Sequence, residues 1–294
     1  MSQIQTTPLH PAFGVDVTGV DLHHATADHL YPQIRALFEE HSLLLFRGQH
    51  LSDEAHLEFG KLFGPIEDRS NYKMDGAPKI SYGVSNETEE GGVFSEDDIR
   101  LLNLQANMLW HTDSTFLPVP ALVNVLQARI VPKAGGATEF VSSRAGFNRL
   151  SPERQDQLRG LTFHHRYAHS RARIDPRLVN MDLIAMWPDT EWQAVWRNPV
   201  NGQDSLYIAS HAFAVSGMGE AEGAAFIDEL MEEVTRPEDI YAHFWQPGDV
   251  LVWDERAVLH RGTPWPYEQP RTLVSCCISA RDVDGLQAMR PRAR

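Results

Sequence analysis

The segment Met-Leu-Trp-His-Thr-Asp-Ser-Thr-Phe at 108–116 constrains the fold of this chain more than any other segment. In an extended chain successive side chains point to opposite faces, so His111 and Asp113 project from the same side of one strand or strand end. One imidazole nitrogen and one carboxylate oxygen are thereby aimed at a common point. The pair can supply two ligands to one metal ion.

A third candidate ligand, His260, lies far downstream, after an apolar run at 250–253 that is typical of a strand. Two histidines and one carboxylate on one face of a metal, with the opposite face open, form the ligand set of non-haem Fe(II) oxygenases. A His-x-Asp pair also arises by chance in a chain with 14 histidines, and a single histidine is more often a surface or core residue. We nevertheless predict that His111, Asp113 and His260 converge on one metal ion.

A lone arginine, Arg271, begins the next β-type run, which ends at Ile278. From a neighbouring antiparallel strand its side chain could reach the same cavity as His260. The guanidinium presents a fixed fork of donors, which suits a bidentate contact with a carboxylate. We therefore predict a carboxylate-binding role for Arg271.

With these residues, the chain resembles the Fe(II)/2-oxoglutarate dioxygenases of the taurine dioxygenase superfamily. It is most similar to the aryloxyalkanoate (2,4-D/dichlorprop) branch, over nearly the whole chain. The motifs that carry the resemblance occur in the family's order at 9–13, 21–22, 46–49, 63–65, 110–114, 135–140, 253–254 and 259–262. So many ordered matches are specific for the family, whereas they leave the substrate open.

The resemblance implies an enzyme that uses Fe(II), O2 and 2-oxoglutarate, and that hydroxylates a small carboxylate such as an aryloxyalkanoate while releasing succinate and CO2. It implies metal ligation and catalysis by His111, Asp113 and His260, and 2-oxoglutarate binding by Thr138, Arg271 and Trp253. A threonine hydroxyl can donate to an anion, as that role requires. For the substrate it implies His211, and a short strand ending near Asn86 could add Ser85 or Asn86.

The same chemistry on a sulfonate such as taurine, or on a natural-product intermediate, is an alternative. Family members that act on taurine or 2,4-D carry a second arginine shortly after the first, where this chain has Ser275. Replacement cations could be Arg69, Lys73, Arg166 or Arg171. An alternative of another class is a metal-binding jelly-roll sensor without activity. A metal role for His164, His165 or His169 is disfavoured because the triad is already complete.

Many short strands with turn signals between them fit a mainly β fold with flanking helices and a jelly-roll core. The resemblance specifies this core as a double-stranded, cupin-like β-helix. The N-terminal third reads as strand, helix, strand and helix, with helices expected over 27–41 and from Ser52. We expect one catalytic domain over 1–294. The acidic stretch at about 68–104 is either a solvated loop or an active-site lid, and the resemblance favours the lid.

Composition excludes some partners. A net charge of −14 argues against nucleic acid, because phosphate backbones require a basic surface. The sequence shows neither a secretory start nor a membrane-spanning apolar run, which predicts a cytoplasmic protein without a membrane partner. Cys276 and Cys277 are adjacent on a predicted strand and point apart, so no disulfide is expected. The expected partners are a small-molecule substrate and further copies of the same chain.

Overall fold

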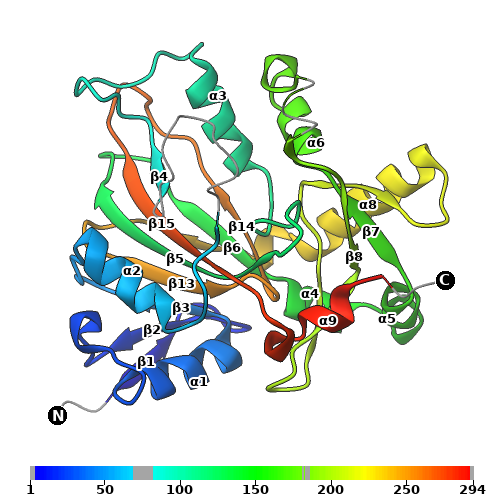
Figure 1. Ribbon diagram of the computed structural model, residues 1–294, viewed down its shortest axis with the longest axis horizontal. Coiled ribbons are helices and arrows are strands. Elements are labelled where there is room, and N and C mark those ends of the chain that lie inside the picture. Colours follow the sequence, from blue (N-terminus) through cyan, green and yellow to red (C-terminus); the bar gives the residue numbers. More distant parts are fainter. Residues whose placement is uncertain (1–3, 69–81, 181, 183–185, 292–294) are drawn as a thin grey trace.

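The computed structural model describes residues 4–68, 82–180, 182 and 186–291. Within them, one sheet has seven strands in the order β1-β2-β3-β13-β5-β15-β4, and two others have three strands each, β12-β6-β14 and β11-β7-β8. A two-stranded ribbon, β10-β9, completes the β-structure of this part of the chain. In Figure 1 the large sheet fills the left of the molecule, and β7, β8 and α8 lie to its right.

The strands are β1 (Gln5–Pro8), β2 (Val15–Thr18), β3 (Leu43–Phe46), β4 (Tyr82–Ser85), β5 (Ala121–Ile130), β6 (Thr138–Ser142), β7 (Thr162–His165), β8 (Thr190–Gln193), β9 (Val195–Arg197), β10 (Asp204–Leu206), β11 (Ala212–Val215), β12 (Tyr241–His243), β13 (Val250–Asp254), β14 (Val258–Gly262) and β15 (Thr272–Ser279). The helices are α1 (Tyr31–His41), α2 (Asp53–Lys61), α3 (Ile99–Gln105), α4 (Ser143–Arg149), α5 (Pro152–Arg159), α6 (Tyr167–Ala172), α8 (Glu220–Val234) and α9 (Leu286–Met289). Among these helices none is both long and apolar enough to cross a bilayer.

The seven-stranded sheet and the β12-β6-β14 sheet pack face to face. Phe140 of β6 and Val258 of β14 share one buried cluster with Leu126, Leu251 and Leu273 of the large sheet. The mostly antiparallel strands of the two sheets therefore enclose a core between them, as in a jelly roll. This arrangement confirms the predicted fold class.

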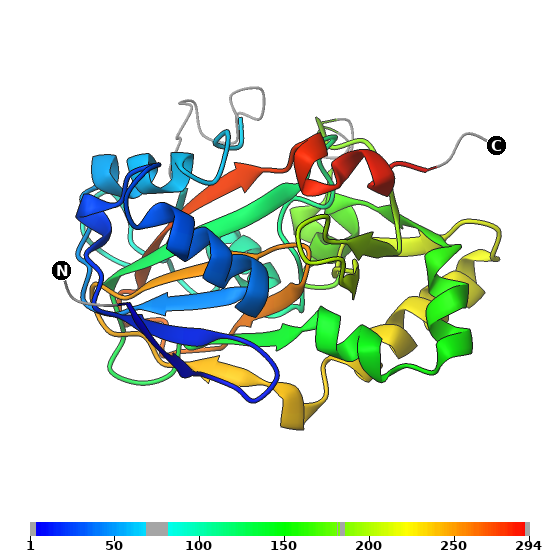
Figure 2. The same ribbon diagram turned by 90° about the horizontal axis from the view of Figure 1, so that it is seen from below.

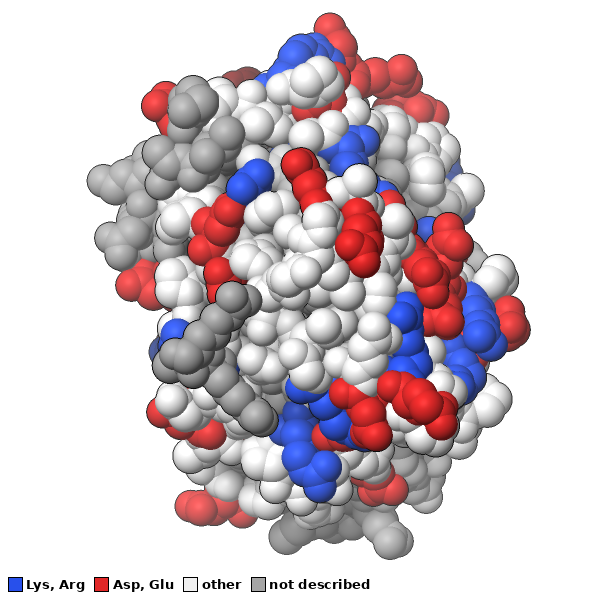
Figure 3. Space-filling view, turned by 90° about the vertical axis from the view of Figure 1, so that its right-hand side faces the viewer, with Lys and Arg blue, Asp and Glu red and all other residues white. Residues whose placement is uncertain are grey.

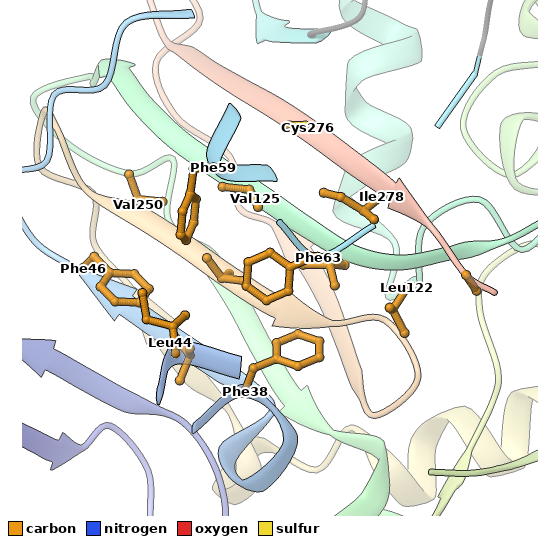
Figure 4. Packing of buried hydrophobic residues seen from close by; sticks show 14 of the residues in the cluster. Phe38, Leu44, Phe46, Phe59, Phe63, Leu122, Val125, Val250, Cys276 and Ile278 are labelled. Atoms are coloured by element: carbon orange, nitrogen blue, oxygen red, sulfur yellow. The ribbon is translucent and has the colours of Figure 1, made fainter. Parts of the chain in front are cut away.

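The apolar run of β13 is continuous because both faces of its sheet are covered. Val250 and Val252 pack with the helices, whereas Leu251 and Trp253, which alternate with them, pack between the two sheets. Figure 4 shows the helix side, where Phe38, Phe59 and Phe63 lie over the strands. Figure 2 shows α1 and α2 on that face of the sheet.

The predicted helix starts are partly confirmed. Ser52 caps α2, because its side chain accepts a hydrogen bond from the Ala55 N–H. The helix expected over 27–41 begins only at Tyr31, since Thr26 pairs with His29 in a β-bridge and Pro32 occupies the first turn. The β-bridge thus shifts the start of the helix to Tyr31, although the apolar spacing of the sequence begins earlier.

The described part of the stretch at 68–104 contains the short strand expected near Asn86, and also a helix that was not expected. β4 pairs with β15 from Ser85↔Thr272 onward and so becomes the edge strand of the large sheet. Asp98 caps α3 by accepting from the Arg100 N–H. Apolar spacing did not predict this helix, because only Leu101 of α3 is buried.

Candidate metal centre and active site

His111, Asp113 and His260 each offer one ligand atom, and these atoms lie within 4.8 Å of one another. Asp113 Oδ1 lies 3.6 Å from His111 Nε2 and 3.9 Å from His260 Nε2. Two imidazole nitrogens and one carboxylate oxygen thus face a common point, as the sequence predicted. This is the one group of its kind in the part of the chain that the structure describes.

Backbone pairing brings the two histidines together. His111 and His260 form an isolated antiparallel bridge, with N–H to carbonyl distances of 3.0 and 2.9 Å. Asp113 lies in the turn that follows, where Ser114 adopts a positive φ of 59°. Of the two predicted alternatives, a strand or a strand end, the structure shows the strand end, and the turn that follows places the carboxylate beside the histidines.

The ring nitrogens are set for ligation. His111 Nδ1 lies 2.7 Å from the Leu109 carbonyl, so Nδ1–H donates there and Nε2 keeps its lone pair for a metal. Burial lowers the pKa of His111 and lowers the pKa of His260 to about 3. Both imidazoles are therefore neutral near pH 7, as metal ligation requires.

Three residues contact Asp113 and a fourth, Ser275, contacts one of these three; sequence reasoning identified none of the four for this role. Asn124 Nδ2 donates to Asp113 Oδ2 at 2.6 Å, and Ser275 Oγ donates to Asn124 Oδ1 at 2.9 Å. The Cys277 thiol lies 3.8 Å from Asp113 Oδ2, and the Asp113 N–H donates to Glu255 Oε2 at 2.9 Å. A polar residue inside an apolar strand, as Asn124 is within β5, is the only signal the sequence offers.

Glu255 is fully buried beside this carboxylate. Burial, and then the charge of Asp113, raise the pKa of Glu255 well above its ordinary value. Burial and the neighbouring Asp113 thus favour the protonated form of Glu255.

Arg271 is buried immediately before β15, and no carboxylate of the described residues lies within ion-pair distance of it. Burial lowers its pKa to about 10, so it stays charged near pH 7. Nε donates to the Gly136 carbonyl at 3.0 Å, and the guanidinium lies 5.0 Å from the Trp265 ring centroid. Gly136 has a φ of 64°, and a Cβ there would lie 3.0 Å from Arg271 Nε, so only glycine allows this approach.

The strand that carries Arg271 is not a neighbour of the strand that carries His260. β15 belongs to the seven-stranded sheet and β14 to the β12-β6-β14 sheet. The expectation of a neighbouring antiparallel strand was wrong. Arg271 belongs to the sheet opposite His260, because the jelly roll folds the two segments into separate layers.

Thr138 begins β6 and is buried. Its Oγ1 accepts a hydrogen bond of 2.9 Å from Trp245 Nε1, which leaves the hydroxyl hydrogen available to an anion. Trp253 packs against the His260 ring, with centroids 4.7 Å apart. Its contact with 2-oxoglutarate stays a prediction.

His211 is buried near the metal group. Its ring centroid lies 6.5 Å from that of His111, its Nδ1 lies 3.4 Å from Thr115 Oγ1, and its Nε2 has no partner among the described residues. Burial lowers its pKa well below the ordinary value, so the ring is neutral. A buried neutral imidazole with one free nitrogen suits the predicted substrate contact.

Asn86 and Ser85 make contacts that the sequence did not indicate. Asn86 Nδ2 donates to the carbonyls of Tyr267 and Gln269, and its Oδ1 accepts from the Arg271 N–H at 2.8 Å. Ser85 Oγ lies 2.6 Å from Thr272 Oγ1. Both residues brace the segment that carries Arg271, and their contact with substrate stays a prediction.

The remaining candidates were two replacement cations for the substrate anion and three histidines considered as metal ligands. Arg69 and Lys73 lie outside the described residues. His164 lies 2.8 Å from Ser216 Oγ, and neither it, His165 nor His169 joins a metal group in the described residues.

Comparisons with known proteins agree with this geometry. Residues 5–277 match the profile of the taurine catabolism dioxygenase TauD, TfdA family. The chain is 34% identical over 275 residues to the alpha-ketoglutarate-dependent 2,4-dichlorophenoxyacetate dioxygenase of Cupriavidus pinatubonensis, covering 92% of this chain and 96% of that protein. It is 33% identical over 288 residues to the (S)-phenoxypropionate/alpha-ketoglutarate-dioxygenase of Delftia acidovorans, covering 95% and 96%. The crystal structure of AAD-2 in complex with Mn(II) and N-oxalylglycine superposes with a TM-score of 0.87 at 29% identity, covering 95% of this chain and 97% of that one.

Proposed function

Because the chain belongs to the taurine catabolism dioxygenase TauD, TfdA family, we propose that it hydroxylates a small organic carboxylate, such as an aryloxyalkanoate, at the site described above. The chain is a 2-oxoglutarate-dependent dioxygenase, which implies Fe(II), 2-oxoglutarate and O2. Family membership thereby decides between the enzyme and a sensor without activity. When bound, iron and 2-oxoglutarate supply oxidative decarboxylation to succinate and CO2, coupled to hydroxylation of the substrate.

In this proposal His111, Asp113 and His260 hold the iron. The support is the donor set itself, two neutral imidazole nitrogens and one carboxylate oxygen within 4.8 Å. Asn124 and the Glu255 carboxyl fix the orientation of Asp113. A metal ion held by these three residues would have further coordination positions for the co-substrate and O2.

Arg271 and Thr138 bind the distal carboxylate of 2-oxoglutarate in this proposal. The single observation that carries the proposed function is that the metal group and Arg271, a buried cation with no carboxylate partner among the described residues, occur in one jelly-roll core. A buried unpaired charge is costly, so an anionic ligand is the natural partner of Arg271. Trp253 would support this pocket from behind His260.

The carboxylate class of substrate is supported by the two relatives, whose names specify aryloxy acids. Buried aromatic side chains near His211 also support an aryl group. Phe116 lies 4.8 Å from the His211 ring and 5.0 Å from the Trp187 ring, measured between centroids. A sulfonate is the competing class, because it carries the same charge.

We also propose that 1–294 forms a single catalytic domain with a lid at about 68–104. The support for the lid is that Asn86 in this stretch contacts the segment of Arg271. A cytoplasmic location is proposed from the two buried cysteine thiols, and self-association is proposed from the exposed apolar side chain of Phe244. Figure 3 views the right-hand side of the molecule in Figure 1 and shows basic side chains mixed with acidic ones on the described part of this face, which is unlike a nucleic-acid-binding surface.

A substrate panel scored by succinate production tests the proposed function. The panel contains 2,4-dichlorophenoxyacetate, both phenoxypropionate enantiomers, taurine and an alkyl sulfate. We expect substrate-stimulated succinate formation with an aryloxy acid and none with His111→Ala at equal iron. If taurine alone stimulates succinate formation, the substrate class is a sulfonate and the proposed carboxylate class is wrong. Succinate formation that survives His111→Ala would contradict the metal assignment.

A further inference from the structure

An anionic substrate needs a cation, and the proposed function leaves that cation unassigned. At the position of the family's second arginine, Ser275 donates to Asn124 Oδ1 at 2.9 Å, and Asn124 holds Asp113. Position 275 therefore supports the metal carboxylate. The substrate anion must be bound by a charge elsewhere.

Arg166 and Arg171 lie on the same short segment but differ in pairing. Arg166 forms two hydrogen bonds of 2.7 Å with Asp189, and both side chains are 40% exposed. Arg171 is only 8% exposed, and no carboxylate among the described residues lies within ion-pair distance of it. Arg166 is thus neutralised at the surface, whereas Arg171 is a buried cation without a counter-charge.

The contacts of Arg171 orient its guanidinium without neutralising it. Nε donates to Asn103 Oδ1 and Nη1 to Ser170 Oγ, both at 3.0 Å, and the guanidinium carbon lies 4.1 Å from the Tyr167 ring centroid. Among the described residues Nη2 has no hydrogen-bond partner. A guanidinium that is oriented by uncharged groups and keeps one free N–H donor is suited to bind an anionic ligand.

The same contacts connect Arg171 to the metal group. The Tyr167 ring is stacked on His211 at an interplanar angle of 13° with centroids 6.2 Å apart, and His211 lies 6.5 Å from His111. In an aryloxyalkanoate the carbon beside the ether oxygen also carries the carboxylate. If this carbon is hydroxylated at the metal, the cation that binds the carboxylate must lie near the metal.

We propose that Arg171 is the specificity-determining residue that binds the carboxylate of the substrate, with His211 Nε2 as a second polar contact. The inference rests on the proposed function, because it presumes an anionic substrate. Phe116 and Tyr167, whose ring centroids are 4.7 Å apart, form an apolar wall beside the same position. An aryl group attached to the carboxylate would pack against this wall.

The test compares binding of 2,4-dichlorophenoxyacetate with binding of its neutral amide. Both are titrated calorimetrically and without oxygen into the protein loaded with Fe(II) and 2-oxoglutarate. For Arg171→Gln we expect the dissociation constant of the acid to rise roughly 30-fold or more, because a buried charge-assisted contact loses one partner. The constant of the amide should change less than about twofold, and Arg171→Lys should recover part of the loss.

Arg166→Gln is the matched control, and it should bind the acid like wild type. An unchanged acid constant in Arg171→Gln, or equal losses for acid and amide, would overturn the role of Arg171 while leaving the proposed function intact. Failure of the wild type to bind the acid would overturn the proposed substrate class and this inference together. If Arg171→Gln does not fold, the acid-to-amide ratio of Arg171→Lys decides by the same criterion.

Discussion

The two faces of the seven-stranded sheet carry different chemistry on neighbouring residues. Val125 and Cys276 point to the helices and pack in an apolar, phenylalanine-rich cluster. Their chain neighbours Asn124, Ser275 and Cys277 point the other way and converge on Asp113. Because side chains alternate along a strand, one set of strands stabilises the fold with every second residue and positions the metal carboxylate with the others.

This separation teaches that stability and iron binding should respond to different substitutions. A substitution on the helix face should lower the unfolding free energy and leave iron binding unchanged. A substitution on the site face should weaken binding at the site and leave the unfolding free energy unchanged. Four substitutions test that separation, and each has a different expected size.

The largest effect is expected from Phe63→Ala on the helix face. Phe63 is fully buried and contacts Tyr31, Phe38 and Phe59, with ring centroids 5.2 to 5.7 Å away. Removing the ring should cost about 3–5 kcal/mol of unfolding free energy, measured by denaturant titration. Fe(II) affinity of the folded fraction should equal that of wild type, and a tenfold loss would break the comparison.

The next effect concerns pH and His56, which is buried under the helix face. Its pKa is lowered to about 4 by burial, below the ordinary 6.5. The unfolded chain therefore binds the proton more readily, and stability falls as pH decreases from about 6.5 toward 4. The loss is about 1.4 kcal/mol per pH unit, on the order of 3 kcal/mol in total.

His56→Gln should remove this part of the pH dependence, because a neutral amide can still donate to the Val125 carbonyl that His56 Nε2 contacts at 3.0 Å. Unfolding free energies of both proteins between pH 4 and 7 provide the measurement. Other buried histidines contribute equally to both proteins and cancel. Parallel curves would show that His56 does not titrate in this way.

Arg271→Ala should weaken 2-oxoglutarate binding and spare iron. Loss of a buried bidentate contact predicts a rise in the 2-oxoglutarate dissociation constant of roughly 30-fold or more, which corresponds to about 2 kcal/mol. Anaerobic titration of the Fe(II) protein, followed by its charge-transfer absorption, provides the constant. Arg271→Lys should recover part of the loss, and equal midpoints in wild type and Arg271→Ala would exclude the assigned role.

The smallest effect is expected from Asn124→Ala on the site face. Without the 2.6 Å hydrogen bond to Asp113, Fe(II) affinity should fall about tenfold, the lower end for residues that orient a metal ligand. Gln127→Ala is the matched control on the helix face of the same strand, where Gln127 donates to the Leu51 carbonyl. If both variants lose iron equally, the two faces are not independent.

The sequence by itself determined the fold class, and it predicted the metal ligands and the co-substrate arginine. These depend on residue identity and local order: His111 and Asp113 two positions apart, Arg271 at the start of a strand, and Ser52 before a helix. The cap of α2 was predictable because the Ser52 side chain bonds to the N–H only three residues away. An interaction between residues a few positions apart can be predicted from the local sequence.

The tertiary structure alone decided which distant groups meet. The bridge between His111 and His260, the hydrogen bonds from Ser275 through Asn124 to Asp113, and the packing of Arg271 against Gly136 all depend on strand register across two sheets. It also separated Arg166 from Arg171, which are equivalent cations in the sequence, by giving only the first a carboxylate partner. Local periodicity specifies the face on which a side chain lies, whereas its partner depends on which strands the whole chain pairs.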